Sequence, residues 1–151
     1  EPKMNDDELK NDNLRQELCF RENVCVAVNE HHPLATRPYV ELMDLADEPM
    51  LTLALDKSSF PRYLIQCCVN AGFQPTIFQE ANEPQTLLAM VGAGLGVALM
   101  PETTSRIGWP GVRFLPIKTN PPSANLYIAY TTQDDAPVIR AFLNILNPPA
   151  A

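Results

Sequence analysis

The stretch from Phe78 to Pro101 most constrains the fold of this chain, because it reads as a strand, a helix and a second strand with marked junctions. The β-branched and aromatic run Thr76–Glu80 predicts the first strand, and the short apolar run Val97–Met100 predicts the second. Between them we expect a helix that begins at about Glu83. Such a β-α-β crossover is parallel and belongs to a sheet that is covered on both faces.

Both ends of the expected helix carry residues that are typical of helix termini. Asn82 is followed three residues later by Gln85 as a capping pair, Pro84 falls in the first turn, and Gly94 supplies the left-handed residue after the last turn. Ligands of parallel sheets collect beyond the carboxyl ends of the strands, where helix N-termini present free N–H groups. The turn at Asn82 is therefore the best candidate site. The apolar positions on one face of the helix are Leu87, Leu88 and Val91.

Two further strands and two helices are predicted before this unit. Asn23–Val28 and Met50–Leu55 are apolar runs expected to be buried strands, with a short helix at Glu41–Asp47 between them. After Met50–Leu55, Ser58 or the next serine can cap a helix that carries Pro61 in its first turn and stops at Gly72. Two helix N-termini are thus expected to face one cleft. The predicted buried stripe of the second helix comprises Leu64, Ile65, Cys68 and Val69.

The last third of the chain predicts a helical turn at Glu102–Ile107, strands at Val112–Ile117 and Leu126–Tyr130, and an amphipathic helix at Asp135–Leu146, begun by Asp134 or Asp135. We expect these strands to have open edges, because strands that would normally pair with them are missing from the sequence. Open edges favour association with another chain. The expected buried face of the helix comprises Val138, Ile139, Phe142, Leu143 and Leu146.

Composition and charge exclude several classes of function. The net charge of −7 and the eleven scattered Lys and Arg residues oppose nucleic-acid binding by this chain, because phosphate contacts need clustered cations. The four cysteines show no C-x-x-C spacing, which predicts free thiols in a reducing cytoplasm. No apolar run is long enough to span a bilayer, and the acidic N-terminus is unlike a signal peptide. A soluble, cytoplasmic domain is expected.

No residue set in the sequence predicts catalysis, a cofactor or a metal. The pair His31 and His32 lacks further ligands at metal-binding spacing and is interpreted as a turn. Ser58 and its neighbour lack the glycines of a nucleophile elbow. The glycines of Gly92–Gly96 lead from a helix into a strand, the reverse of a dinucleotide-binding turn. Glu80 and Glu83 serve the helix dipole and solvent rather than acid–base chemistry.

Four segments resemble the effector-binding domain of LysR-type transcriptional regulators, in that family's order and at its spacings. The hallmark is Glu80–Pro101, EANEPQTLLAMVGAGLGVALMP, and the others are His32–Ala35, Leu42–Pro49 and Ala71–Pro75. The resemblance covers about Leu18–Leu146. It implies an α/β, periplasmic-binding-protein-like (type 2) fold of two doubly wound lobes, one largely complete and the other partial.

The resemblance also implies a division of the chain and a site. Residues 1–20 would lead from the partial first lobe, residues 21–100 would form the effector-binding subdomain II, and residues 101–151 would return to subdomain I. Effector contacts are expected from Arg21, Thr52, Asn82, Glu83 and Pro84. Two readings of Arg21 remain open, an anion contact or a hinge residue. Thr52 could equally be a plain strand threonine, and Asn82 a plain helix cap.

By the same resemblance, a small-molecule effector, commonly an organic anion, binds between the lobes of a homodimer or tetramer. DNA would be contacted only through a helix-turn-helix in a segment that precedes this sequence, since Met4 is the first methionine and the resemblance begins within a domain. Two alternatives share the architecture. A solute-binding protein of a transporter would require an export signal, and an enzyme would require a titratable pair in the cleft.

Overall fold

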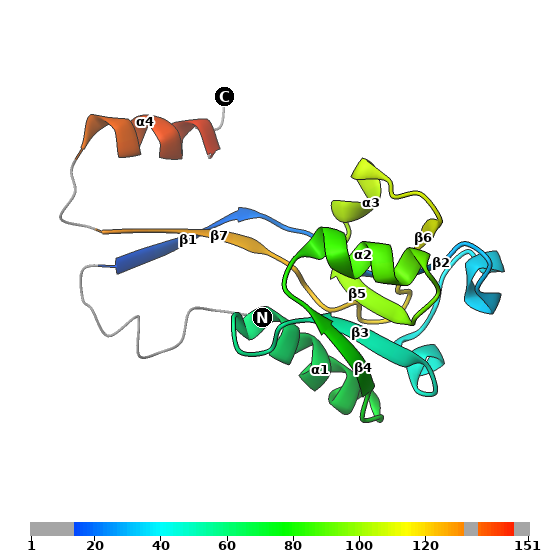
Figure 1. Ribbon diagram of the computed structural model, residues 1–151. Helices are drawn as coiled ribbons and strands as arrows, with labels where there is room; N and C mark the ends of the chain where they lie inside the picture. The colour runs from blue at the N-terminus through cyan, green and yellow to red at the C-terminus, as the bar shows by residue number, and fades with distance from the viewer. Residues whose placement is uncertain (1–13, 132–135, 147–151) are drawn as a thin grey trace. The chain divides into compact units, whose positions relative to one another are not determined.

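A five-stranded mixed sheet forms the centre of residues 22–124, the larger of the two units into which the chain divides (Figure 1). The computed structural model describes residues 14–131 and 136–146. In the strand order β4-β3-β5-β2-β6, β3 pairs in parallel with β4 and β5, whereas β2 pairs antiparallel with β5 and β6. The strands are β2 (Val24–Asn29), β3 (Pro49–Leu53), β4 (Thr76–Ala81), β5 (Val97–Pro101) and β6 (Val112–Pro116).

Alternate residues of the central strands are buried on opposite faces of the sheet. Val26 of β2 packs in one apolar cluster with Leu64 of helix α1 (Ser59–Ala71), whereas Ala27 packs in another with Leu87 of helix α2 (Pro84–Gly92). Because side chains of a strand alternate with a period of two, α1 and α2 cover opposite faces, as Figure 1 shows. Two short 3₁₀ helices share the α1 face: η1 (Pro33–Thr36) and η2 (Leu42–Leu45).

The predicted β-α-β unit is confirmed. Strands β4 and β5 both lie parallel to β3, so the crossover through α2 passes over β3. Gly94 ends the helix with a left-handed φ of 78°, as expected. Gly96 then brings the chain close to the start of β3, because a Cβ placed there would lie 2.3 Å from the Pro49 carbonyl oxygen. The predicted buried residues Leu87, Leu88 and Val91 are buried.

Helix α1 also follows its sequence signals, with one exception. The Ser58 hydroxyl accepts a hydrogen bond from the Phe60 N–H at 3.2 Å, and Gly72 ends the helix with a φ of 111°. Leu64 and Cys68 are buried, but Val69, which was predicted to lie on the same buried stripe, is 40% exposed. The buried stripe of α1 is therefore narrower than predicted.

Strand β6 was predicted to lack a partner within the chain, and that prediction was wrong. Val26 pairs with Leu115, and β6 thus becomes an outer strand of the larger sheet. Val40 adds a parallel bridge beyond it, since its N–H donates to Pro116 O and its carbonyl accepts from the Lys118 N–H, both at 3.0 Å. After β5, the predicted helical turn is α3 (Thr104–Ile107).

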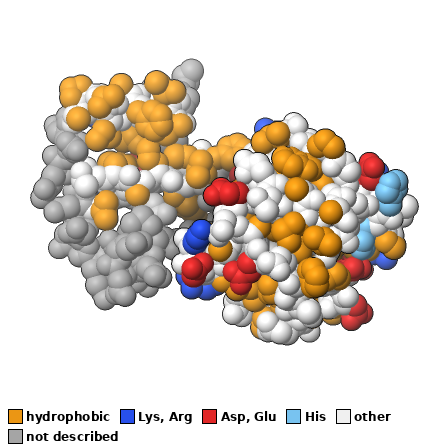
Figure 2. All heavy atoms as spheres, viewed as in Figure 1, with side chains coloured by type: hydrophobic (Ala, Val, Ile, Leu, Met, Phe, Trp, Pro, Cys, Tyr) orange, Lys and Arg blue, Asp and Glu red, His pale blue; other side chains and the backbone are white. Residues whose placement is uncertain are grey.

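The smaller unit contains β1 (Leu14–Phe20), β7 (Leu126–Thr131) and α4 (Pro137–Leu146). Strand β7, also expected to be unpaired, pairs antiparallel with β1, a strand that the sequence did not predict. The proposed helix start at Asp134 or Asp135 lies outside the described residues. The apolar face of α4 was predicted to be buried, but Val138 is 73% exposed, and Figure 2 shows hydrophobic side chains gathered over this helix.

All four cysteines lie in the described residues and are free thiols, as predicted. Cys25 and Cys68 are buried, and burial raises the pKa of Cys25 to about 12 and that of Cys68 to about 11. These two thiols therefore serve as small apolar core residues. In the described part of the chain, no helix is long and apolar enough to cross a membrane.

We predict that Gly96→Ala destabilises the chain by about 1–3 kcal/mol, because the added methyl group must displace the backbone at Pro49. Urea unfolding followed by circular dichroism measures the effect. The neighbouring Leu95 is 44% exposed, so Leu95→Ala should change the free energy of unfolding by less than about 0.5 kcal/mol. Equal midpoints for the two variants would contradict the close approach.

Candidate functional site

The carboxyl ends of β3, β4 and β5 meet at one edge of the sheet, because these three strands are parallel. Thr52 is the penultimate residue of β3 and lies opposite Glu80 of β4. Asn82 and Glu83 follow β4 directly, before the start of α2. We call Thr52, Asn82, Glu83 and Pro84 the carboxyl-edge site. Four of the predicted site residues thus lie at the ends of two adjacent strands, β3 and β4.

Thr52 is the most distinctive member of this site. It is only 8% exposed, and no other buried polar or charged side chain occurs among the described residues. Thr52 stands two residues after Met50, which packs in the α1 cluster, so the alternation of the strand turns Thr52 toward that same face. Its hydroxyl therefore lies near the edge where the loop from β3 leads into α1.

The start of α2 differs from the prediction that Asn82 is its cap. The N-cap residue is Glu83, whose backbone is extended (φ −127°, ψ 143°), and no side chain hydrogen-bonds to the first N–H groups. Pro84 explains the shift, because proline disfavours the helical conformation of the residue before it. The helix therefore cannot begin before Pro84, and Asn82 lies one residue outside its cap. Asn82, Glu83 and Pro84 are all exposed.

The loop between β3 and α1 is held against β4. The Ala54 N–H donates to Ala81 O at 2.9 Å, and the Leu55 N–H donates to Glu80 Oε2 at 3.1 Å. Glu80 was interpreted as a residue of the helix dipole and solvent, but its carboxylate binds this loop. Its position opposite Thr52 in the β3–β4 pairing gives Glu80 a positioning role beside the carboxyl-edge site.

Both covalent links to the smaller unit leave the larger unit at this same edge. Glu22 O accepts from the Ala124 N–H at 2.9 Å, and Pro122 O accepts from the Val24 N–H at 2.8 Å. The Glu22 carboxylate also accepts from the Thr103 N–H, just after β5, at 2.9 Å. Glu22 was not predicted as a functional residue, because a single acidic residue before a strand gives no sequence signal.

Arg21, the remaining predicted site residue, is the last residue of the smaller unit before the chain enters the larger one. Its side chain is exposed. The structure therefore brings together Thr52, Asn82, Glu83 and Pro84 on one edge, and it places Arg21 at a link between the two units.

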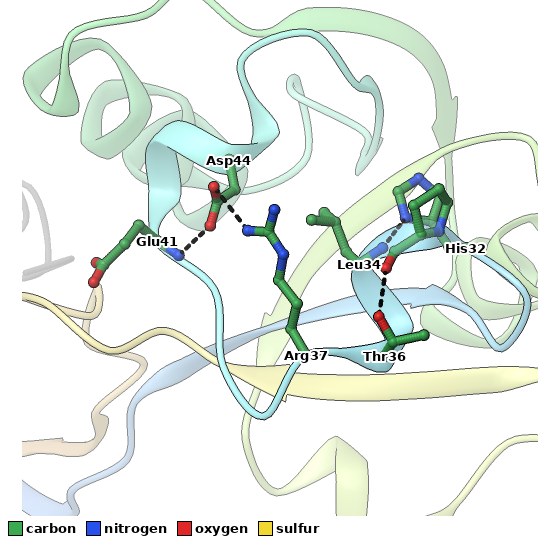
Figure 3. Close-up of polar contacts among 7 residues, drawn as sticks. His32, Leu34, Thr36, Arg37, Glu41 and Asp44 are labelled. Carbon is green, nitrogen blue, oxygen red and sulfur yellow. Dashed lines mark hydrogen bonds and ion pairs between the residues drawn. The ribbon is translucent and has the colours of Figure 1, made fainter.

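The turn around His32 is built from internal hydrogen bonds (Figure 3). His32 Nδ1 accepts from the Leu34 N–H at 3.1 Å, so Nε2 carries the hydrogen and donates to Glu48 Oε2 at 3.1 Å. Asp44 accepts from the Glu41 N–H at 2.8 Å and pairs with Arg37 at 3.0 Å. These two contacts, the Glu41 N–H first, lower the pKa of Asp44. The turn interpretation of His32 agrees with these contacts.

The carboxyl-edge site is suited to binding. It offers the hydroxyl of the largely buried Thr52 and the free N–H groups at the start of α2, which are donors for an anion or a polar oxygen. Within residues 14–131 and 136–146, no group of three or more His, Cys, Asp or Glu side chains could hold a metal ion. Recognition of a small polar molecule is the chemistry that these residues supply.

Comparison with known proteins identifies the family of this domain. The profile of the LysR substrate binding domain matches residues 5–148. The HTH-type transcriptional regulator XapR of Escherichia coli is 39% identical over 121 residues, which are 80% of this chain and 40% of XapR. AlsR of Bacillus subtilis, another HTH-type transcriptional regulator, is 34% identical over 127 residues, 82% of this chain and 41% of AlsR. The chain thus spans about two fifths of the length of these relatives.

Solved structures match as well. The effector-binding domain of a variant of BenM, a regulator from Acinetobacter baylyi, superposes with a TM-score of 0.81 at 26% identity and covers 90% of this chain and 64% of that one. The BenM domain with its effector benzoate gives a TM-score of 0.75 at 25% identity, over 92% of this chain and 68% of that one. The predicted type 2 periplasmic-binding-protein-like fold is confirmed.

We predict that Ser58→Ala lowers the free energy of unfolding by about 1 kcal/mol, since it removes the cap of α1. Asn82→Ala should change it by less than about 0.5 kcal/mol, because Asn82 is exposed and lies outside the cap of α2. Urea unfolding of the two variants provides a matched comparison. A loss at Asn82 equal to that at Ser58 would mean that Asn82 caps the helix after all.

Proposed function

Since this chain belongs to the family of LysR substrate-binding domains, we propose that it is the effector-sensing part of a transcriptional regulator. Relatives that are 39% and 34% identical are HTH-type transcriptional regulators, which supports the assignment. DNA would be contacted by a helix-turn-helix elsewhere in the full protein, because this chain has a net charge of −7 and scattered cations. The full protein would act in the cytoplasm as a dimer or tetramer.

The proposed effector is a small organic anion that binds at the carboxyl-edge site. The observation that carries this proposal is Thr52 at the end of β3, the one polar side chain that is buried among the described residues. Because most of this residue is enclosed, a ligand oxygen that meets its hydroxyl gains a specific donor. The free N–H groups at the start of α2 favour a negative charge there. Benzoate, the effector of BenM, is an anion of this class.

Arg21, the remaining residue of the expected site, would add a cation to such a ligand. Its guanidinium, a fixed fork of donors, suits a carboxylate. An effector favours one arrangement of the full regulator over another by the difference between its affinities for the two. We propose that this population shift is the signal that reaches the rest of the regulator.

Two other functions share the architecture and have less support. Among the described residues of the carboxyl-edge site, the side chains are a threonine, an asparagine, a glutamate and a proline, which include no nucleophile with an adjacent base. An enzyme is therefore disfavoured. A solute-binding protein of a transporter would be expected to match transport proteins, whereas the relatives named above are regulators.

We predict that Thr52→Val weakens effector binding by about two- to tenfold, because valine keeps the shape of threonine and removes its hydroxyl donor. A panel of small monocarboxylates that includes benzoate would first be ranked by the thermal stabilisation of the 151-residue chain. Calorimetric titration of the best ligand then gives its Kd for each variant. Thr76→Val, at the opposite end of β4 and exposed, is the matched control and should leave Kd unchanged.

The panel also tests the assignment as a whole. If no carboxylate stabilises the chain, the proposed class of effector is wrong. If a carboxylate binds with equal affinity to the wild type and to Thr52→Val, the site lies elsewhere. Unchanged affinity in folded Asn82→Ala would remove Asn82 from the site and leave Thr52 in it.

A further inference from the structure

A pocket of about 470 Å³, which we call the α1 pocket, lies within the larger unit and shares no residue with the carboxyl-edge site. One wall is helix α1, another is the residues around η2, and the third is the segment of residues 119–122 that follows β6. None of its lining residues belongs to the carboxyl-edge site. Its volume lies within the range of small-molecule sites in proteins.

The pocket combines an apolar lining with a few polar groups. Met43, Cys67, Ala71 and Pro121 supply apolar atoms, and Tyr63 adds an aromatic ring. Met43 is 51% exposed, which is high for a methionine beside an apolar core. A flexible thioether next to a tyrosine ring adapts to flat apolar groups. This lining favours a ligand that carries an aromatic ring.

The walls are fixed by hydrogen bonds rather than by packing alone. Both the N–H and the hydroxyl of Thr119 donate to the Glu41 carboxylate, at 3.1 and 2.9 Å. The Ser123 N–H donates to the Tyr63 hydroxyl oxygen at 3.1 Å. Asn120 adopts a left-handed φ of 46°, a conformation that asparagine tolerates better than most residues. The segment of residues 119–122 is therefore held open over α1, and the pocket is preformed.

The lining of the pocket carries one carboxylate and no cationic side chain. The carboxylate is that of Glu41, and the other lining residues have apolar, amide, hydroxyl, phenol or thiol side chains. The nearby cations are engaged elsewhere, because Lys118 donates to the Tyr39 hydroxyl at 3.2 Å and lies 4.4 Å from its ring centre, and Arg37 pairs with Asp44. The Glu41 carboxylate thus faces the pocket without a cationic partner among the lining residues.

From this geometry we propose that the pocket is a second ligand site, which takes a small organic cation carrying an aromatic ring. The ring would lie against Met43 and Tyr63, and the ammonium group would approach Glu41. This preference is opposite in charge to that of the carboxyl-edge site. The proposal does not depend on the identity of the effector, because no residue is shared.

The far wall of the pocket also connects the ligand to the links between the units. Pro121 and Pro122 line the pocket, and Pro122 O accepts the Val24 N–H at 2.8 Å. Two residues later, the Ala124 N–H donates to Glu22 O. A ligand that rigidifies this wall should slow hydrogen exchange at the amides of Val24 and Ala124.

The test uses two probes of similar size and opposite charge, 2-phenylethylammonium and 3-phenylpropionate. The full 151-residue chain would be labelled with ¹³C in the methionine methyl groups, so that the Met43 signal reports on the pocket. The ammonium probe should shift the Met43 signal in a saturable way and should slow exchange at Val24 and Ala124. The carboxylate probe should bind at least about threefold more weakly, because it meets the Glu41 charge.

Two variants and their controls decide the outcome. Glu41→Gln keeps an acceptor for Thr119 and should abolish the preference for the ammonium probe, whereas Asp47→Asn removes an equal charge at an exposed position outside the lining and should preserve it. Ala71→Trp should fill the pocket and abolish the shift, whereas Val69→Trp, on an exposed part of α1, should retain it.

The proposal is overturned if Met43 does not respond to the ammonium probe, or if both probes bind equally to the wild type. A shift that survives in folded Ala71→Trp would likewise place the probe elsewhere. Should Ala71→Trp fail to fold, Glu41→Gln still decides the matter through its charge preference.

Discussion

Burial of β2 on both faces is the constraint on which the larger unit depends. Its residues from Val24 to Val28 are at most 3% exposed, although Cys25 and Ala27 face one helix and the valines face the other. Strand β2 is also flanked by β5 and β6, so its backbone bonds are paired on both sides. A strand enclosed in this way cannot carry polar chemistry. The polar side chain of β2, Asn29, therefore stands at its end, and the site and the links between the units lie at one edge of the sheet.

The parts of the fold that could be predicted are those in which neighbouring residues determine the structure. The unit from β4 to β5 has its strand, helix and stop signals within one short stretch, and these were interpreted correctly. Strand β6 was predicted as a strand but without a partner. Its partner β2 lies far away in the sequence, and no local pattern indicates that pairing. Strand β1 was missed for the same reason, since it is defined by its pairing with β7. The amphipathic pattern of α4 likewise predicts an apolar face, but burial of that face depends on whether another element packs against it.

The site shows a similar division between local and long-range signals. Thr52 could be named from its place at the end of an apolar run, and its burial in the structure makes it stand out. Asn82 was assigned as the cap from a favourable spacing, but Pro84 constrains the preceding residue more strongly than a side-chain hydrogen bond could compensate. Glu80 and Glu22 hold backbone N–H groups of distant segments, at Leu55 and Thr103, which a sequence pattern cannot reveal. The segment of residues 118–124 is likewise held by hydrogen bonds to the distant residues Glu41 and Tyr63.

The unequal burial of the four thiols gives the chain a built-in labelling scheme. Cys25 and Cys68 are enclosed and hold their protons, so alkylating reagents should leave them unmodified at neutral pH. Cys19 and Cys67 are partly exposed, and one lies in each unit. A donor and an acceptor dye attached to these two natural cysteines would report the distance between the units by energy transfer. No cysteine would have to be introduced. The dye on Cys67 would stand at the α1 pocket, so the same label would also sense its occupancy.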